Sequence, residues 1–556
     1  MDTNEHEIGR LIRQGESLTL EFKSDLKCLP DRDLVATVVS LANTEGGELL
    51  LGVEDDGTVS GLHANHFNVS GIPSLVANKT NPALSVRVER CDLQGKSVAR
   101  ITVPKSRQLV STSDGLLVRR RIRLDGTPEA VPFYPHEFIQ RQSSMGLVDP
   151  SAMVLEEIDA SQLDPLQRLR IRNAIKKYGG EQSLLALADD ELDGALGLCR
   201  EINGVRRPTI AGLLLLGTES LLRQHLPAYE VAFQVLHGTD VRVNEFFCKP
   251  LLETFEEVEL LFKARVEEEE IQVGLFRVPV PNYDRRAFRE AFVNALVHRD
   301  FSRLGAVHVK ITGDGLSISN PGGFVEGVTL DNLLVADPRS RNPLLADVIK
   351  RIGLAERTGR GIDRIYEGML RYGRPAPDYS MSDEFTVSVQ MANVAADLDF
   401  LKMVIEQEDK LGNMPIDSLI ILSRLREERR LTTTDLAPSV QKTEVNVRAT
   451  LEKLVETGFL EPHGTGRGRT YTLSAALYRK AGKKSEYIRQ TGFAPIQQEQ
   501  MVLNYIDKHG SIKRADVMDL CHITQDQAYK LLSRLKRRDE IVQIGDRKGA
   551  IYERKR

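Results

Sequence analysis

Three carboxylates and a lysine near the start of the chain have the types and spacing of a chemical site. Glu16 and Glu21 are five residues apart, Lys23 follows two residues later, and Asp55 lies further along the chain. Groups rich in carboxylate oxygens bind hard cations such as Mg²⁺ or Mn²⁺, which keep positions free for water and phosphate. The amine of Lys23 suits a phosphate or a developing negative charge. The alternative is a surface ion pair beside a turn of solvated acids.

Two expected strands with a helix between them would carry these side chains to one place. In the segment ESLTLEFK apolar and polar residues alternate, so a strand would direct Glu21 and Lys23 from the same face. Residues 33–42 have the spacing of an amphipathic helix, and residues 48–53 are typical of a buried strand that ends in an acidic turn. This strand–helix–strand unit predicts that Asp55 approaches the two glutamates.

The same segment resembles the Schlafen AlbA-type domain in three motifs, namely EFK, ANTEGG and GVED. In nuclease-active Schlafens, two glutamates five residues apart and an aspartate after the Gly-Val pair form the metal site. By position these roles fall on Glu16, Glu21 and Asp55. The resemblance implies a metal-dependent nuclease, although many similar domains bind nucleic acid without cutting it. The zinc motif of animal Schlafens has no counterpart, because the five cysteines form no C-x-x-C pair.

A run of arginines near the end of this segment is a candidate phosphate-binding strip. Arg119, Arg120, Arg121 and Arg123 fall on an expected edge strand before a turn at 125–126. Guanidinium groups bind phosphate oxygens in pairs, so the strip would contact a nucleic-acid backbone beside the carboxylates. The alternative is an edge strand whose charge prevents pairing with other strands.

A second set of candidate residues begins with a helix expected over 285–302. Glu290 and Asn294 are four residues apart, so the helix would present a carboxylate and an amide on one face. Two glycine turns follow, the second of which leads into a helix, and they contain Asn320, Gly322, Gly323, Gly359 and Gly361. Glycine turns let backbone amides approach phosphates, although each one alone is more often a plain turn.

The order of the motifs REAFVNALVHRDF, SNPGGF and GLAERTGRGI resembles the GHKL ATPases, most closely the branch described as RecG-like helicase C-terminal domains. The resemblance covers about residues 245–393 and implies ATP and Mg²⁺ as ligands. It implies that Glu290 positions the attacking water and that Asn294 binds Mg²⁺. The four glycines would border the triphosphate and its lid. Typical members read adenine with an aspartate where this chain has Asn320, so ATP binding is better supported than turnover. No G-x-x-x-x-G-K-[ST] motif occurs, which argues against a P-loop helicase.

Two similar segments at the end of the chain, 400–480 and 494–556, have the order of winged helices: helix, turn, longer helix and basic hairpin. In the second copy the expected recognition helix is 525–537, with the wing near 545–549. Its basic residues are Lys530, Arg534, Lys536, Arg537 and Arg538. They favour docking on DNA, whereas the alternative is a protein-binding or dimer module. The first copy is the weaker candidate for DNA binding, because three glutamates reduce the positive charge of its helix.

Length and composition limit the remaining possibilities. A chain of 556 residues corresponds to about three to five domains. The net charge of −4 excludes uniform coating of nucleic acid, so binding must come from local patches. The sequence shows no signal-peptide pattern and no apolar run long enough for a bilayer, and its scattered cysteines fit a reducing cytoplasm. We therefore expect a cytoplasmic protein with no membrane partner.

Together the patterns predict a multidomain α/β and α+β protein. A Schlafen AlbA-like α+β domain is expected at 1–145, a connecting domain with an apolar strand at 209–216 is expected at 146–240, and a GHKL (Bergerat) α/β sandwich is expected at 241–395. The two winged helix-turn-helix domains complete the chain.

Two functions fit this organisation. One is an ATP-regulated, metal-dependent nuclease with a defence role against foreign nucleic acid, and the carboxylate trio favours it. The other is a non-catalytic, ATP-responsive DNA-binding transcriptional regulator. A homo-oligomer is expected, because GHKL domains commonly close by dimerisation. The nucleic acid itself, DNA or structured RNA, stays open.

Overall fold

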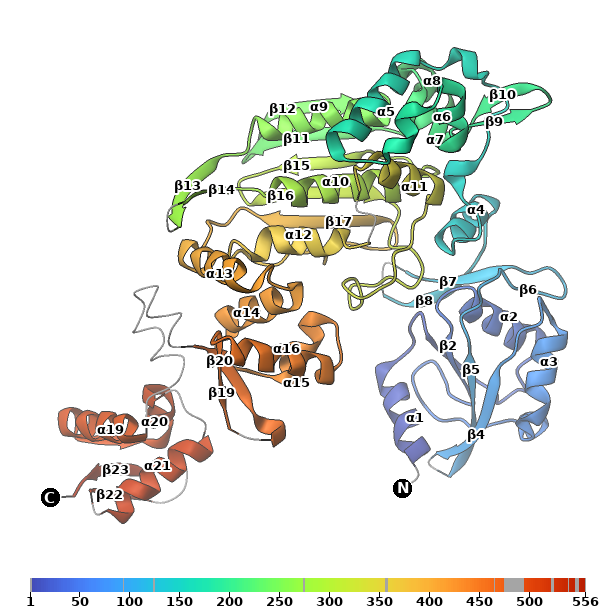
Figure 1. Cartoon of the computed structure of the whole chain (residues 1–556). Coiled ribbons are helices and arrows are strands. Elements are labelled where there is room, and N and C mark those ends of the chain that lie inside the picture. The colour runs from blue at the N-terminus through green and yellow to red at the C-terminus, as the bar shows by residue number, and fades with distance from the viewer. Residues whose placement is uncertain are drawn as a thin grey trace. The chain divides into compact units, whose positions relative to one another are not determined.

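The chain divides into two units, residues 1–150 and 151–556, each with its own hydrophobic clusters (Figure 1). The computed structural model describes residues 3–555 except 94, 124–125, 274–275, 356–358, 465, 475–494, 522–524, 539 and 546–549.

The first unit is built on a four-stranded sheet in the order β1-β2-β5-β4. β1 and β2 are parallel and are joined through α2, whereas the other pairs are antiparallel. The elements are α1 (Thr3–Gln14), β1 (Leu20–Lys23), α2 (Asp31–Ala42), β2 (Gly47–Leu51), η1 (Ala64–His66), α3 (Ile72–Asn78), β3 (Thr80–Asn81), β4 (Arg87–Leu93), β5 (Lys96–Val103), β6 (Ser111–Thr112), β7 (Val118–Ile122), β8 (Pro128–Pro132) and α4 (Pro135–Ser144).

The alternation expected in the first strand is present, but the strand is shorter. Leu20 and Phe22 are buried, whereas Glu21 and Lys23 alternate with them on the other face. β1 begins only at Leu20, because Ser17 N–H turns back to the Leu20 carbonyl at 2.9 Å. Glu16 therefore lies before a turn rather than within the strand.

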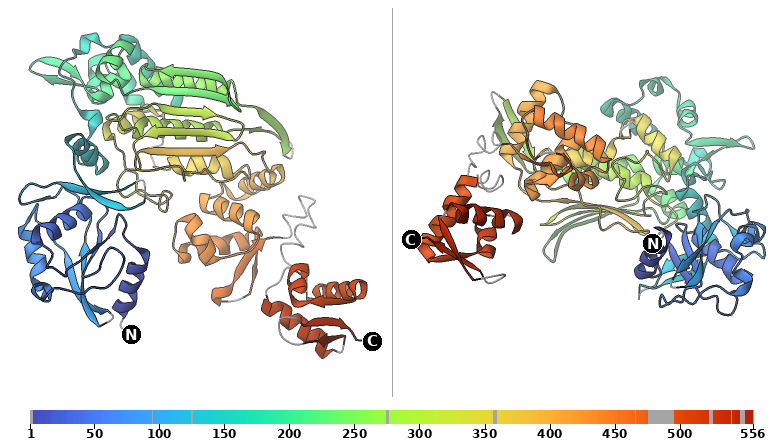
Figure 2. Two further views of the ribbon diagram at one scale, coloured as in Figure 1. Left: turned by 180° about the vertical axis from the view of Figure 1, so that it is seen from behind. Right: turned by 90° about the horizontal axis from the view of Figure 1, so that it is seen from below.

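The centre of the second unit is a five-stranded sheet in the order β12-β11-β15-β16-β17. Helices α9, α10 and α12 cover one of its faces (Figure 2). The elements up to the last strand of this sheet are α5 (Pro165–Tyr178), α6 (Asp189–Ala195), β9 (Cys199–Ile202), β10 (Val205–Pro208), α7 (Ile210–Leu216), α8 (Glu219–His225), β11 (Val231–His237), β12 (Asp240–Phe247), α9 (Leu251–Lys263), β13 (Glu268–Val273), β14 (Phe276–Pro281), α10 (Arg285–His298), β15 (Val307–Ile311), β16 (Gly315–Pro321), α11 (Pro343–Ile352), α12 (Gly361–Leu370) and β17 (Thr386–Ala392).

One hydrophobic cluster runs from Ile158 to Met391 and joins the helices of 165–225 to the sheet. The boundary expected at residue 240 falls within the β11–β12 hairpin, in which Val231 pairs with Phe247. The connecting segment therefore shares its core with the sheet that follows.

The strand expected at 209–216 is wrong, because residues 210–216 form the buried helix α7. Thr209 Oγ1 accepts a hydrogen bond from Gly212 N–H at 3.0 Å and caps the first turn. A short, wholly apolar run has no periodicity that separates a buried strand from a buried helix, so the capping threonine was the informative residue.

Two segments of similar construction follow, each with three helices and a three-stranded antiparallel sheet. The first contains α14 (Ile416–Glu428), β18 (Leu431–Thr432), α15 (Thr433–Val440), α16 (Glu444–Glu456), β19 (Leu460–His463) and β20 (Thr470–Leu473), preceded by α13 (Leu398–Leu411). The second contains α19 (Pro495–His509), β21 (Ser511–Lys513), α20 (Arg514–Cys521), α21 (Gln525–Arg537), β22 (Ile541–Ile544) and β23 (Ile551–Arg554). Most of its expected wing, 546–549, lies outside the described residues.

Candidate functional sites

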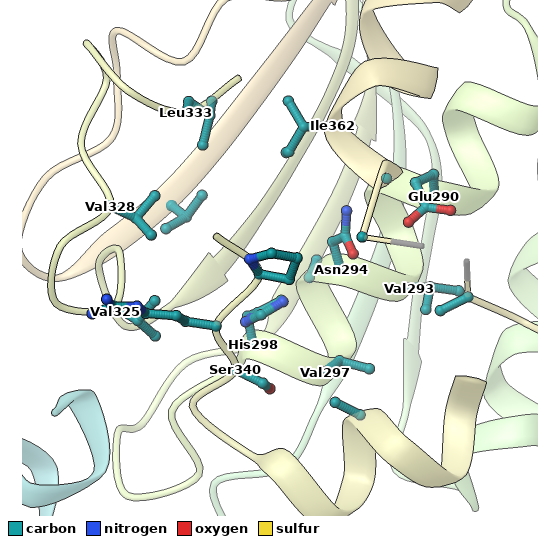
Figure 3. Close-up of a pocket in the computed structure, with 18 of the residues that line it drawn as sticks. Glu290, Val293, Asn294, Val297, His298, Val325, Val328, Leu333, Ser340 and Ile362 are labelled. Atoms are coloured by element: carbon teal, nitrogen blue, oxygen red, sulfur yellow. The ribbon is translucent and has the colours of Figure 1, made fainter. Parts of the chain in front are cut away.

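A cavity of about 510 Å³ lies against α10 in the second unit. Glu290, Asn294 and His298 follow each other at four-residue spacing along this helix and line the cavity (Figure 3). The helix starts where Asp284 Oδ1 accepts the backbone N–H groups of Arg286 and Ala287, both at 2.8 Å. The cap therefore fixes where α10 starts, and the helical period places its polar residues on the cavity side.

The predicted glycine turns reach the same cavity with one exception. The lining includes Asn320, Gly323, Gly359 and Gly361. Gly322 lies behind the wall, where its N–H donates to the Phe385 carbonyl at 2.6 Å and a Cβ would lie 2.8 Å from Asp300 Cβ. Asn320 is buried, and its Nδ2 donates to the Pro321 carbonyl at 3.2 Å. Residues 356–358 of the expected lid lie outside the described residues.

Gly361 brings the start of α12 onto the Glu290 carboxylate. A Cβ at Gly361 would collide with Glu290 Oε1 and lie 2.9 Å from its Cδ. Only glycine permits this approach. Glu290 is 4% exposed, so the positive end of the α12 dipole faces a buried carboxylate.

The rest of the lining combines an apolar wall with charged side chains. The apolar residues include Val293, Val297, Val325, Val328, Leu333 and Ile362 (Figure 3). Besides Glu290, the charged residues of the lining are Asp337, Arg339, Asp347, Lys350 and Asp363. Apolar pockets with a few convergent polar groups are typical of small-ligand sites. The cavity therefore suits a ligand that has both an apolar part and charged groups.

Sequence reasoning missed His298 and the loop that contains Arg339. Burial, together with the charges of Arg341 and Lys350, lowers the pKa of His298 from 6.5 to about 4. The imidazole is thus neutral at neutral pH. The position of His298 could have been predicted from the sequence, because it continues the four-residue spacing of Glu290 and Asn294.

In the first unit the Glu21 carboxylate is held between two cations. Lys23 Nζ lies 2.5 Å from Glu21 Oε1, and Arg120 lies 2.5 Å from Glu21 Oε2. The Arg120 side chain is only 2% exposed and also donates to the Ser17 carbonyl at 2.7 Å. Arg120 therefore does not lie on an exposed phosphate-binding strip, because its guanidinium is used to hold Glu21.

The Glu16 carboxyl is influenced electrostatically by Glu21 and Asp55. Glu16 Oε1 accepts Phe22 N–H at 3.0 Å, and Asp55 is exposed. Burial is the largest cause that raises the pKa of Glu16, and the charges of Glu21 and Asp55 raise it further against the lowering effects of Phe22 N–H and Lys23.

The donor set fits Mg²⁺ or Mn²⁺ in chemistry, since a cation would relieve this repulsion. All three residues lie in the described part of the chain, and their carboxylate oxygens are not all within 4.8 Å of one another. A metal ion held by Glu16, Glu21 and Asp55 would share the Glu21 carboxylate with Lys23 and Arg120.

The ANTEGG motif positions the arginine strand, a role that sequence reasoning missed. Asn43 Nδ2 donates to the carbonyls of Val110 and Val118 at 2.7 and 2.9 Å. Thr44 Oγ1 accepts Arg120 N–H at 2.8 Å. These bonds hold β7 so that Arg120 reaches Glu21.

The other three arginines are paired with carboxylates of their own hairpin and its flanking helix. Arg119 pairs with Glu137 at 2.5 Å, and Arg121 and Arg123 pair with Glu129 at 2.6 and 2.8 Å. Arg121 and Arg123 keep more than half of their side chains exposed, at 56% and 55%. These two remain candidates for contact with phosphate.

The basic residues of α21 also divide into two groups. Arg534 and Arg538 pair with Glu499 at 3.2 and 2.9 Å, and Lys536 donates to Gln543 at 3.1 Å. Lys530 and Arg537 are exposed. In the first copy, Arg469 pairs with Glu452 at 2.8 Å. Lys536 and Arg538 are exposed as well but have the partners named above, so Lys530 and Arg537 are the better candidates for phosphate contact.

Family comparisons match four segments of the chain. Residues 16–127 match Schlafen, AlbA_2, and residues 305–389 match the family described as "Putative ATP-dependent DNA helicase recG C-terminal". Residues 138–232 match a domain of unknown function, and residues 417–555 match the DNA glycosylase AlkZ-like family. No curated protein matches the chain. Within the described residues, no helix combines the length and apolar character needed to cross a membrane.

Among solved structures, the crystal structure of the DIP2311 protein from Corynebacterium diphtheriae is similar in fold. It is 21% identical with a TM-score of 0.51, and the match covers 86% of this chain and 98% of that one. The mRNA-binding domain of elongation factor SelB from E. coli, in complex with SECIS RNA, is 15% identical with a TM-score of 0.14, covering 25% of this chain and 98% of that one. Together the family matches support a nucleic-acid-related function. The chain therefore carries a Schlafen AlbA_2 segment and a recG C-terminal, HATPase_c_4 segment.

Proposed function

We propose that this protein binds ATP in the cavity beside α10 and that the bound nucleotide controls its action on nucleic acid. The observation that carries the proposal is the convergence of Glu290, Asn294 and four residues of the glycine turns on one cavity. In the family that these motifs resemble, they serve ATP and Mg²⁺. Glycine backbone beside a helix start suits phosphate, and the Asn294 amide oxygen suits Mg²⁺.

The nucleic-acid contact is assigned by this proposal to the C-terminal segments and to the first unit. The two three-helix segments have the element order of winged helices, and the AlkZ-like match spans both. Lys530 and Arg537 would contact the phosphate backbone beside α21. We further propose a homo-oligomer that closes when ATP binds.

The more specific proposal is a metal-dependent nuclease that uses Glu16, Glu21 and Asp55. A bound Mg²⁺ or Mn²⁺ would supply an activated water for phosphodiester hydrolysis. Arg120 would orient the Glu21 carboxylate, as partners behind a metal ligand commonly do. The raised pKa of Glu16 supports this candidate, because like charges next to a partly buried carboxyl are typical of functional sites.

A non-catalytic, ATP-responsive DNA-binding regulator is the second candidate. Both oxygens of Glu21 are already paired with cations, and this observation favours it. A carboxylate neutralised in this way contributes to a stable binding platform without a metal.

One experiment separates the two. The full-length protein is incubated with labelled transfer RNA, single-stranded DNA and duplex DNA, with Mg²⁺ or Mn²⁺ and with or without ATP. A Glu16→Gln/Asp55→Asn variant is the matched control, because it keeps the volume of both side chains. Metal-dependent cleavage by the native protein alone would establish the nuclease and name its substrate. Binding without cleavage under every condition would leave the regulator.

A further inference from the structure

Asp25, Cys28 and His66 form a compact cluster in the first unit, made of residues different from the three proposed carboxylate ligands. One oxygen, one sulfur and one ring nitrogen from these side chains all lie within 4.8 Å of one another. No other group of three or more potential metal ligands meets this distance within the residues that the structure describes.

The chain holds this cluster by backbone hydrogen bonds around Asp25. The Asp25 side chain is completely buried, and its oxygens accept Leu29 N–H at 2.8 Å and His63 N–H at 2.7 Å. Cys28 N–H donates to the Asp25 carbonyl at 3.1 Å, and Cys28 has φ +57°, an uncommon conformation for cysteine. This turn brings the thiol back towards the aspartate.

The histidine comes from a separate part of the chain. His66 ends η1, and its Nδ1 lies 2.8 Å from Asp25 Oδ1. The His66 side chain is 12% exposed and Cys28 is half-buried, so the cluster is accessible from solvent on one side. The aspartate thus holds the imidazole in place beside the thiol before any ligand arrives.

We infer that Asp25, Cys28 and His66 bind a divalent transition-metal ion of the Zn²⁺ class. Sulfur and imidazole donors select Zn²⁺ over Mg²⁺ and Mn²⁺, which prefer oxygen ligands. Three protein ligands and access to solvent leave a fourth position for water. Cys28 would bind the ion as the thiolate, which is the metal-binding form of cysteine. The ion would tie the connection between β1 and α2, which begins just after Lys23, to η1.

The test uses full-length protein stripped with a chelator and then titrated with Co²⁺, a spectroscopic probe for this class of site. The native protein should show a thiolate-to-cobalt charge-transfer band that saturates at about one equivalent and that Zn²⁺, but not excess Mg²⁺, abolishes. Cys28→Ser should remove the band, and His66→Ala should weaken binding at least tenfold. His63→Asn is the matched control, because its backbone N–H to Asp25 is kept, its side chain is outside the cluster, and asparagine can still cap η1 as His63 Nδ1 does for Asn65 N–H.

A second measurement guards against variants that fail to fold. Zn²⁺ should raise the melting temperature of the native protein and of His63→Asn but not of Cys28→Ser, with all three melting alike in chelator. The inference is overturned if the native protein gives no charge-transfer band, or if Cys28→Ser binds Co²⁺ with the same band and affinity. In that case the cluster is a hydrogen-bonded turn only.

Discussion

Replacing Gly361 by alanine tests whether the contact between α12 and Glu290 shapes the cavity beside α10. The added methyl would overlap Glu290 Oε1 and approach Cδ to 2.9 Å and Cγ to 3.2 Å, so the whole carboxyl group must move. Forcing a side chain off its rotamer costs about 0.5–1.5 kcal/mol, and overpacking a buried site costs about 1–3 kcal/mol. We expect a net cost of about 1–2 kcal/mol, which corresponds to about 5- to 30-fold in ATP affinity if it falls on the cavity.

The assay is a double-mutant cycle on ATP affinity and on the urea unfolding of the full chain. Glu290→Ala removes the atoms that the methyl meets, so the Glu290→Ala/Gly361→Ala variant should recover about 1–2 kcal/mol relative to additivity. Gly194→Ala is the control, because Gly194 lies in a helix with nothing within 4 Å of an added Cβ. A Gly361→Ala protein with native ATP affinity and stability, or strictly additive effects in the cycle, would refute the reasoning.

Three further predictions concern single features. The pKa of His298 is lowered from 6.5 to about 4 in the folded state, so the unfolded chain takes up this proton first as the pH falls, and stability contributed by the neutral imidazole is lost between pH 6.5 and 4. His298 should account for about 2 kcal/mol of the stability lost between pH 7 and pH 4.5 in urea unfolding, so the loss should be smaller in His298→Gln. Equal losses in both proteins would contradict the assignment. Arg120→Gln should destabilise the first unit by about 3–5 kcal/mol in thermal unfolding, since it leaves the largely buried Glu21 with Lys23 alone, whereas the exposed Arg121→Gln should cost under about 1 kcal/mol. Lys530→Ala/Arg537→Ala should weaken duplex DNA binding and reduce the slope of log affinity against log salt by about 1.8, and an unchanged slope would remove α21 from the DNA contact.

Local patterns predicted the elements that line the cavity beside α10. Four-residue spacing placed Glu290 and Asn294 on one face of α10, and the glycine positions indicated where backbone approaches the cavity. The bounds of α21, Gln525–Arg537, also follow from its amphipathic spacing. These features depend on short-range periodicity, which a sequence carries directly.

The long-range pairs could not be derived in this way. Arg120 reaches Glu21 across 99 residues only because Asn43 and Thr44 hold β7. No local pattern in the run of arginines at 119–123 indicates this pairing. One hint existed, since Arg120 shares a strand face with the buried Val118. The Asp25–Cys28–His66 cluster likewise depends on a connection closed by backbone hydrogen bonds.

The central claim is that the cavity beside α10 binds ATP. Its most direct test is a calorimetric titration of the full-length protein with ATP in the presence of Mg²⁺, repeated with Asn294→Ala. The account predicts saturable binding of one ATP per chain and at least tenfold weaker binding when the Asn294 amide is removed. Absence of saturable binding at millimolar ATP, or equal affinity in the two proteins, would contradict it.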